Sequence, residues 1–182
     1  MAFSIVHTTT ADLGNIYSFF DASVLYQQAH AYPDWRNYDR NVILNDIRNK
    51  TQYKLITEGE MALVFSVCYS DPLIWGETDK ADALYIHRMV VNPSHKGKRL
   101  FEHVLDWCVE QCKQAGLHFV RMDTWADNPA LIKYYQSFGF SRVRHVTTPN
   151  SAALPAHNRG LALALLSFEL HKAEEQKDLL GG

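Results

Sequence analysis

The stretch over residues 85–101 constrains the fold of this chain more than any other part of it. It opens with an apolar run typical of a strand, turns at Asn92-Pro93, passes through the basic loop Lys96-Gly97-Lys98-Arg99 and continues as a helical pattern. A strand that leads directly into a helix leaves the first helical N–H groups unpaired, and these groups together with the helix dipole favour an anion. The stretch therefore predicts a site for a phosphate-bearing ligand, with a solvated basic turn as the alternative.

The remaining composition is that of an ordinary globular chain. Hydrophobic residues make up 47% and charged residues 21% of the 182 positions, which suits one domain with a substantial core. The formal net charge of −2 argues against a dedicated nucleic-acid binder, so the basic loop is a local feature. No apolar run is long enough to span a bilayer and the N-terminus does not resemble a signal peptide, so we expect a cytoplasmic protein without a membrane partner.

The cysteines and histidines suggest neither a disulfide framework nor a metal site. Cys68, Cys108 and Cys112 are odd in number and lack a Cys-x-x-Cys spacing. Cys108 and Cys112 lie one helical turn apart and are interpreted as packed core thiols. The histidine spacing indicates no metal ligation.

Hydrophobic periodicity and turn residues predict the elements in order. They are a strand over residues 4–8, a helix capped by Thr10 that extends to Val24 or Leu25, a helix over 39–49, a hairpin of strands over 53–57 and 61–69, a central strand over 83–91, a helix between Gly97 and Gly116 with an apolar stripe from Phe101 to Ala115, a strand over 117–124, a helix from Asn128 to Gly139, and strands over 140–146 and 161–170. This order predicts a mixed α/β sheet rather than a regular doubly wound one.

The spacing of the later elements relates the basic loop to a known family. Met89-Val90-Val91-Asn92-Pro93 and Lys96-Gly97-Lys98-Arg99-Leu100-Phe101 are followed by Asn128, by Tyr135 seven residues later, and by Gly139-Phe140. This arrangement resembles the core of the GNAT-type acetyl-CoA-dependent N-acetyltransferases over about residues 83–146. The resemblance implies a central, mostly antiparallel sheet of six to seven strands flanked by about four helices. We expect one such domain over residues 1–171 and a charged tail over residues 172–182.

The resemblance also implies acetyl-CoA as cosubstrate. In this family the amides of a Gln/Arg-x-x-Gly-x-Gly/Ala loop bind the pyrophosphate of coenzyme A. Lys96 takes the first position here, whereas Arg99 and Phe101 occupy the two small positions, and Arg99 offers a guanidinium in exchange. The implied cofactor-binding residues are Met89, Val90 and Val91 on the strand, Lys96, Gly97, Lys98, Arg99, Leu100 and Phe101 in the loop, and Asn128, for which helix capping is the alternative.

Proton transfer is assigned in the same way. The resemblance implies that Tyr135 is the general acid toward the departing thiolate. Where some family members carry a carboxylate early in the central strand, this chain has Tyr85. Regular alternation puts Tyr85, His87 and Met89 on one face of the strand, and an imidazole titrates near neutral pH, so His87 is the candidate general base. Asp123 is the second candidate, and a histidine simply hydrogen-bonded in place is the alternative.

The substrate candidates are Tyr32 and Trp35, in a loop rich in large aromatic residues, together with Tyr85 and Asp123. A packed turn is the other interpretation of that loop.

The predicted function is acetyl transfer to a primary amine, favouring a small molecule, by direct attack in a ternary complex. One alternative is a GNAT-fold protein without catalysis that binds a coenzyme A derivative or serves as an interaction module, as Arg99 and Phe101 suggest. The other is a nucleotide-phosphate module prompted by Gly97-Lys98, although the chain lacks Gly-x-x-x-x-Gly-Lys-Ser/Thr. No nucleic acid is expected, and a homodimer is left open.

Overall fold

The structure is a computed structural model that describes residues 3–32, 35, 37–154 and 158–170. The chain forms two compact units. Unit 1 comprises Met1–Val67, His87–Val104 and Ser151–Arg159, and unit 2 comprises Cys68–Ile86, Leu105–Asn150 and Gly160–Gly182. The strand β4 and the helix α4 contribute residues to both units. The predicted tail over residues 172–182 lies outside the described residues.

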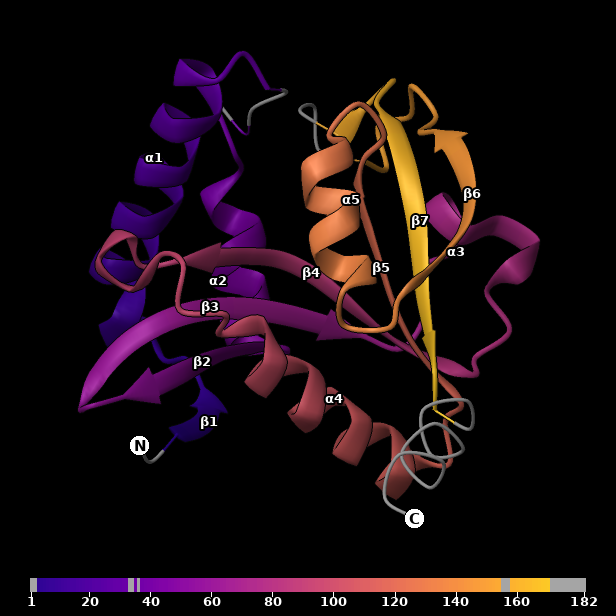
Figure 1. The fold of residues 1–182 in the computed structure, drawn as a ribbon. Coiled ribbons are helices and arrows are strands. Elements are labelled where there is room, and N and C mark those ends of the chain that lie inside the picture. The colour runs from indigo at the N-terminus through magenta and orange to yellow at the C-terminus, as the bar shows by residue number, and fades with distance from the viewer. Residues whose placement is uncertain (1–2, 33–34, 36, 155–157, 171–182) are drawn as a thin grey trace. The chain divides into compact units, whose positions relative to one another are not determined.

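The elements are labelled in Figure 1. Unit 1 contains β1 (Phe3–His7), the 3-10 turn η1 (Thr10–Asp12), α1 (Leu13–Ala29), α2 (Arg40–Arg48), β2 (Gln52–Thr57), nearly all of β3 (Glu60–Cys68), the second part of β4 (Ala83–Val91), the 3-10 turn η3 (Pro93–His95) and the start of α4 (Phe101–Ala115). Unit 2 contains α3 (Pro72–Trp75), the 3-10 turn η2 (Gly76–Thr78), the first part of β4, most of α4, β5 (Phe119–Trp125), α5 (Pro129–Gln136), β6 (Ser141–Thr147) and β7 (Ala162–Glu169).

The strands follow the order β1-β2-β3-β4-β5-β7-β6 in a seven-stranded sheet. The β1–β2, β2–β3, β5–β7 and β6–β7 pairs are antiparallel, and β4–β5 is parallel because α4 connects these two strands. The predicted mixed, mostly antiparallel sheet is therefore confirmed. The last strand, β7, lies between β5 and β6, a position that the sequence left open.

The parallel ladder between β4 and β5 is short. It pairs Ala83–Ile86 with Phe119–Met122, although β4 continues to Val91 and β5 to Trp125. On its other edge β5 pairs with β7 along its whole length, from Phe119 opposite Glu169 to Trp125 opposite Leu163.

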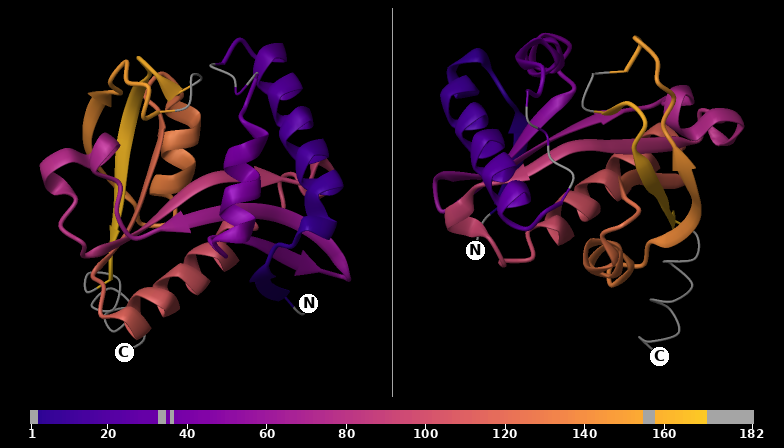
Figure 2. Two further views of the ribbon diagram at one scale, coloured as in Figure 1. Left: turned by 180° about the vertical axis from the view of Figure 1, so that it is seen from behind. Right: turned by 90° about the horizontal axis from the view of Figure 1, so that it is seen from above.

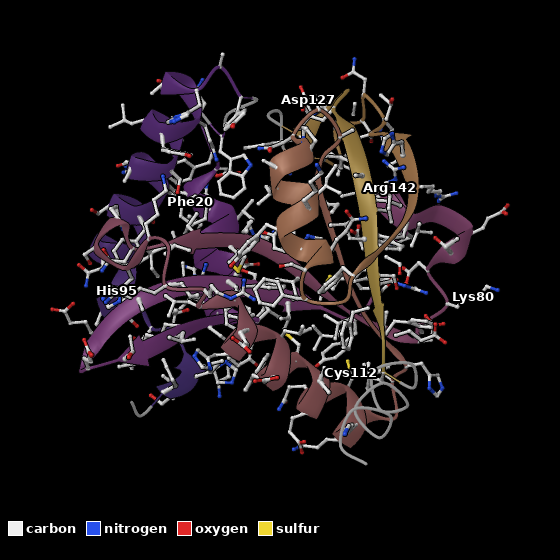
Figure 3. All side chains as sticks on the ribbon, in the orientation of Figure 1. Phe20, Lys80, His95, Cys112, Asp127 and Arg142 are labelled. Atoms are coloured by element: carbon white, nitrogen blue, oxygen red, sulfur yellow. The ribbon has the colours of Figure 1, made fainter. Side chains whose placement is uncertain are left out.

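Helices α1 and α2 form the core of unit 1 with two strands. Figure 2 shows both helices on one face of the strands β2 and β3, and Figure 3 labels Phe20 on α1. The buried residues of this core are Ile16, Phe19 and Phe20 from α1, Ile43 and Ile47 from α2, Val64 from β3 and Val90 from β4. Their spacing along each helix is the three-and-four repeat of an amphipathic helix, as the sequence predicted.

The core of unit 2 includes Trp75, Ala83, Tyr85 and Leu165. Cys108 and Cys112 on α4 are fully buried, and burial raises the pKa of both thiols, which confirms their interpretation as core thiols. The predicted apolar stripe of α4 ends at Cys112 because Ala115 is exposed.

Three local predictions needed correction. The first helix extends to Ala29, and the residue before its 3-10 start is Thr9 rather than the predicted cap Thr10: the Thr9 N–H donates to an Asp12 carboxylate oxygen at 2.7 Å. The short helix α3 was missed because one turn that begins at a proline carries no measurable periodicity.

Among the described residues, no helix has both the length and the apolar character needed to cross a bilayer.

Candidate active site

The second half of β4 is bent at Arg88, whose φ of 49° is left-handed. This conformation is costly for a residue with a Cβ, and an ion pair supports it. Arg88 donates from Nε to Asp46 Oδ2 on α2 at 2.9 Å. The Nη2 atom of Arg88 lies 2.7 Å from the same oxygen. Ser66 on β3 donates to that oxygen as well, at 2.7 Å. The bend interrupts regular alternation, so counting from Tyr85 does not by itself determine the face of Met89.

The candidate base and the candidate pantetheine-binding residues lie on either side of this bend. His87 is half-buried, and burial together with the charge of Arg88 lowers its pKa to about 3. The imidazole is therefore neutral at physiological pH, able to accept a proton but a weak base. Met89 and Val91 are half-buried, whereas Val90 packs in the core of unit 1.

The basic loop begins at the turn η3. Asn92 accepts hydrogen bonds from Ser94, donates to the Met61 carbonyl at 3.0 Å and thereby ties the turn to the β2–β3 hairpin. Gly97 has a φ of 82° and Arg99 a φ of 51°. The family's small position therefore coincides with a left-handed residue, which explains why glycine suits it and makes Arg99 a strained substitute.

Two backbone donors of this loop have no partner in the described part of the chain. The N–H groups of Gly97 and Leu100 make no hydrogen bond there. Both residues come just before Phe101, the first residue of α4, and the helix dipole favours an anion at this end of a helix. The loop can therefore hold an oxyanion with backbone groups, and its exposed lysines add positive charge.

The loop side chains divide into two classes. Leu100 and Phe101 are buried, so they face the interior rather than a ligand. Lys96, Lys98 and Arg99 are exposed. The Lys96 ammonium lies 3.2 Å from the ring centroid of Tyr26 on α1, in a cation–π contact.

Unit 2 carries the candidate acid. Tyr135 on α5 is buried, and burial, followed by the neighbouring Tyr134 and the charge of Asp123, raises its pKa well above the usual value. Its hydroxyl is therefore protonated at neutral pH and able to donate. Asn128 accepts a hydrogen bond from the Leu131 N–H at 3.0 Å, which confirms it as the cap of α5 and leaves its predicted cofactor contact untested.

A buried arginine beside Tyr85 escaped the sequence reasoning. Arg121 on β5 is directly opposite Tyr85 in the parallel register, and one of its terminal nitrogens donates to the Tyr85 hydroxyl, the Thr78 carbonyl and Asp82 Oδ1 at 3.1, 2.9 and 3.0 Å. The Tyr85 hydroxyl donates to Asp79 Oδ1 at 2.9 Å. Tyr85 is fully buried and its hydroxyl is engaged within unit 2, which weakens its proposed role as a substrate contact.

The aromatic loop after α1 is tied to that helix. The Trp35 N–H donates to the Gln27 side chain at 3.0 Å, and the Tyr32 N–H donates to the Gln27 carbonyl at 3.0 Å. The Trp35 ring packs against Phe20 in the core of unit 1. These contacts favour a packed turn for Trp35, and the role of Tyr32 in substrate binding stays a prediction. Residues 33, 34 and 36 lie outside the described residues.

The sequence over residues 52–140, which includes the bent strand, the loop and α5, matches the model of the Acetyltransferase (GNAT) family. This match covers just under half of the chain and, together with the fold, supports its assignment to the GNAT-type N-acetyltransferase superfamily. The predicted resemblance is thus confirmed, and the family match together with the curated relatives supports an N-acetyltransferase.

Curated relatives agree with this assignment. The chain is 24% identical over 172 residues to the L-amino acid N-acyltransferase MnaT of Escherichia coli, a match that covers 94% of this chain and 96% of MnaT. It is 31% identical over 75 residues to YesJ of Bacillus subtilis, an uncharacterized N-acetyltransferase. That second match covers 38% of this chain and spans only 39% of YesJ.

Solved GNAT structures share the fold. A GNAT acetyltransferase from Listeria monocytogenes aligns with a TM-score of 0.72 at 19% identity, covering 92% of this chain and 95% of that one. YncA of Salmonella typhimurium, a putative acetyltransferase solved with acetyl-CoA, aligns with a TM-score of 0.64 at 18% identity, covering 93% and 95%. The fold prediction is confirmed, whereas the roles of individual residues remain predictions.

Proposed function

We propose that this GNAT protein is an acetyl-CoA-dependent N-acetyltransferase that acetylates the primary amine of a small molecule by direct attack in a ternary complex. The observation that carries the proposal is the loop before α4, in which two N–H groups without a partner among the described residues lie among three exposed cationic side chains. This donor set suits the pyrophosphate of coenzyme A. The burial of Phe101 supports the fit, because a large side chain at a small position is directed into the interior.

Acetyl-CoA would supply an acetyl group activated as a thioester. Met89–Val91 are proposed to lend backbone groups to the pantetheine arm and to polarise the thioester carbonyl. Tyr135 is proposed to give its proton to the departing sulfur, which the raised pKa of its hydroxyl supports. His87 is proposed to take the proton of the amine, directly or through water. Its low pKa keeps it unprotonated across the physiological range but limits its strength as a base.

For the acceptor, we propose a small amine such as an amino acid. MnaT is described as an L-amino acid N-acyltransferase, and a spermidine N-acetyltransferase chimera of Vibrio cholerae and human SSAT shares the fold with a TM-score of 0.65 at 13% identity, covering 94% of this chain and 98% of that one. The more extensive sequence similarity to MnaT places amino acids ahead of polyamines.

The test combines binding with turnover. Isothermal titration with acetyl-CoA and with coenzyme A should give saturable binding, and a thiol-release assay over amino acids and polyamines should identify the acceptor. Tyr135→Phe should lower kcat by about 100-fold, the scale of a lost general acid, with little change in coenzyme A binding. Tyr134→Phe, on the same helix, is the matched control. Equal rates in wild type and Tyr135→Phe would refute the assigned acid, and absence of binding would refute the proposal as a whole.

The strained Arg99 specifically favours a second candidate, a GNAT protein that binds a coenzyme A derivative without catalysis. In that case titration would show binding, whereas no amine would release thiol above the uncatalysed rate.

A further inference from the structure

A buried histidine connects the loop to the β2–β3 hairpin. His95, at the end of η3, has only 3% of its surface exposed, and Figure 3 labels it. Its Nε2 lies 3.2 Å from Glu60 Oε2 at the start of β3, and its Nδ1 lies 3.4 Å from Lys98 Nζ in the loop. The three side chains Glu60, His95 and Lys98 therefore form a continuous chain, named here the Glu60 relay.

The chemistry of lysine determines the tautomer of His95. An ammonium has three donors and no acceptor, so Nδ1 of His95 must accept from Lys98. The ring proton of the neutral imidazole then lies on Nε2 and is donated to the Glu60 carboxylate. A buried neutral ring thus joins an anion at one end to a cation at the other.

We propose that His95 is a positioning residue that, through Nδ1, holds the Lys98 ammonium beside the loop for the phosphates of coenzyme A. This inference rests on the proposed function. One ammonium donor goes to His95, which leaves two for phosphate oxygens. A flexible lysine that is already restrained loses less rotamer freedom on binding, so the relay raises affinity without touching the ligand.

The surroundings of the relay support a fixed platform. Asn92 ties η3 to Met61, and the Asn92 N–H donates to the Ala62 carbonyl at 2.8 Å, so the backbone that carries His95 is anchored to β3. Glu60 is 68% exposed and lines an open groove of about 420 Å³ with Asn15, Phe19, Gly59, Met61, Asn92 and Ser94. Glu60, at one end of the relay, is therefore exposed to solvent and tolerant of substitution, whereas His95 at its centre is buried.

If the relay acts through Lys98, the effect of removing His95 should depend on whether the acetyl donor carries phosphates. His95→Phe keeps a ring of similar shape and removes both nitrogens. It should raise KM for acetyl-CoA and Kd for coenzyme A by about 3- to 10-fold, the scale of one released side chain, with kcat unchanged. S-acetyl-pantetheine has no phosphates, so wild type and His95→Phe should use it equally well.

A double-mutant cycle tests whether His95 acts through Lys98. In a Lys98→Met background, His95→Phe should have no further effect on Kd for coenzyme A, measured by titration. Additive effects, or an equal loss with S-acetyl-pantetheine, would overturn the proposal. If His95→Phe does not fold, Glu60→Ala at the exposed end should raise KM for acetyl-CoA by a smaller factor and leave the use of S-acetyl-pantetheine unchanged. Absence of that rise in Glu60→Ala would also overturn the proposal. Failure of wild type to bind coenzyme A would instead refute the proposed function.

Discussion

The loop before α4 and the arginine cluster of unit 2 (Arg121 with Thr78, Asp79, Asp82 and Tyr85) both contain cationic side chains, but these cations have different surroundings. Lys96, Lys98 and Arg99 are exposed, and backbone donors beside them have no partner in the described chain. Arg121 is 8% exposed, and one terminal nitrogen already serves three acceptors of unit 2. The difference teaches that a cation indicates a ligand where it is exposed beside backbone donors that lack partners in the described residues, and not where it is buried among its own acceptors.

The arginine cluster is built as an internal structure. The guanidinium carbon of Arg121 lies 5.0 Å from the Trp75 ring centroid and 4.7 Å from that of Phe119, so aromatic faces cover it. Its Nε has no hydrogen-bond partner in the part of the chain that is described. A buried donor that lacks a partner costs free energy, and the bonds of the terminal nitrogen have to offset that cost.

The largest expected effect therefore belongs to Arg121. Arg121→Met removes the shared donor and leaves Asp82 and the Tyr85 hydroxyl without their cation, which should lower the free energy of unfolding by about 3 to 5 kcal/mol. Urea unfolding followed by circular dichroism measures it. The control is Arg142→Met on the exposed strand β6, which should change stability by less than about 0.5 kcal/mol. Equal stability of Arg121→Met and wild type would place Arg121 in the same class as the loop cations.

The contrast between the two regions also shows how far the sequence could go. Spacing was enough to predict the strand Ala83–Val91, the cap Asn128 and the mixed sheet, because each rests on a local pattern. The partnership of Arg121 with Tyr85 could not be predicted, since it depends on the register of two strands separated by a helix.

The same limit applies within the candidate site. The loop was recognised from its residues, but the left-handed conformations of Arg88 and Arg99 were not, because propensity assigns both to ordinary backbone. The ion pair between Arg88 and Asp46 and the contact of Lys98 with His95 likewise join residues whose proximity no periodicity reveals.

The next prediction concerns pH. Burial acts to raise the pKa of Asp79, but hydrogen bonds from Ser70, Tyr85 and backbone N–H groups outweigh it and lower the pKa. Burial raises the pKa of Tyr85 to about 12, and an arginine stays charged throughout. A carboxyl with a depressed pKa stabilises the fold above its unfolded value and loses that contribution as pH falls through the folded value.

The stability difference between wild type and Asp79→Asn should therefore be constant from about pH 5 to 9 and should shrink only below about pH 4. Urea unfolding of both proteins across this range measures it. Taking the difference cancels His87, whose lowered pKa reduces the stability of both proteins as pH falls below about 6.5. A difference that already fell between pH 8 and 6 would show that another titrating group controls the cluster.

The smallest expected effect belongs to Arg99, and its sign is opposite to that of Arg121. A left-handed φ of 51° costs about 1 kcal/mol for a residue with a Cβ, and glycine removes that cost. Glycine also adds freedom to the unfolded chain, which takes back roughly 0.5 to 1 kcal/mol. Arg99→Gly should therefore leave the free energy of unfolding unchanged or raise it slightly, as urea unfolding measures. Lys133→Gly, inside α5, should lower the free energy of unfolding by about 1 kcal/mol.

The same variant separates strain from function in the loop. If Arg99 is kept for its guanidinium, Arg99→Gly should weaken coenzyme A binding by about 3- to 10-fold at low salt, and the loss should diminish as ionic strength rises. If binding instead tightens, the arginine obstructs the approach of the phosphates that glycine permits in the family, and the loop cations would then act through the two lysines alone. Titration at two salt concentrations distinguishes these outcomes, because a charge contact is screened and a steric obstruction is not.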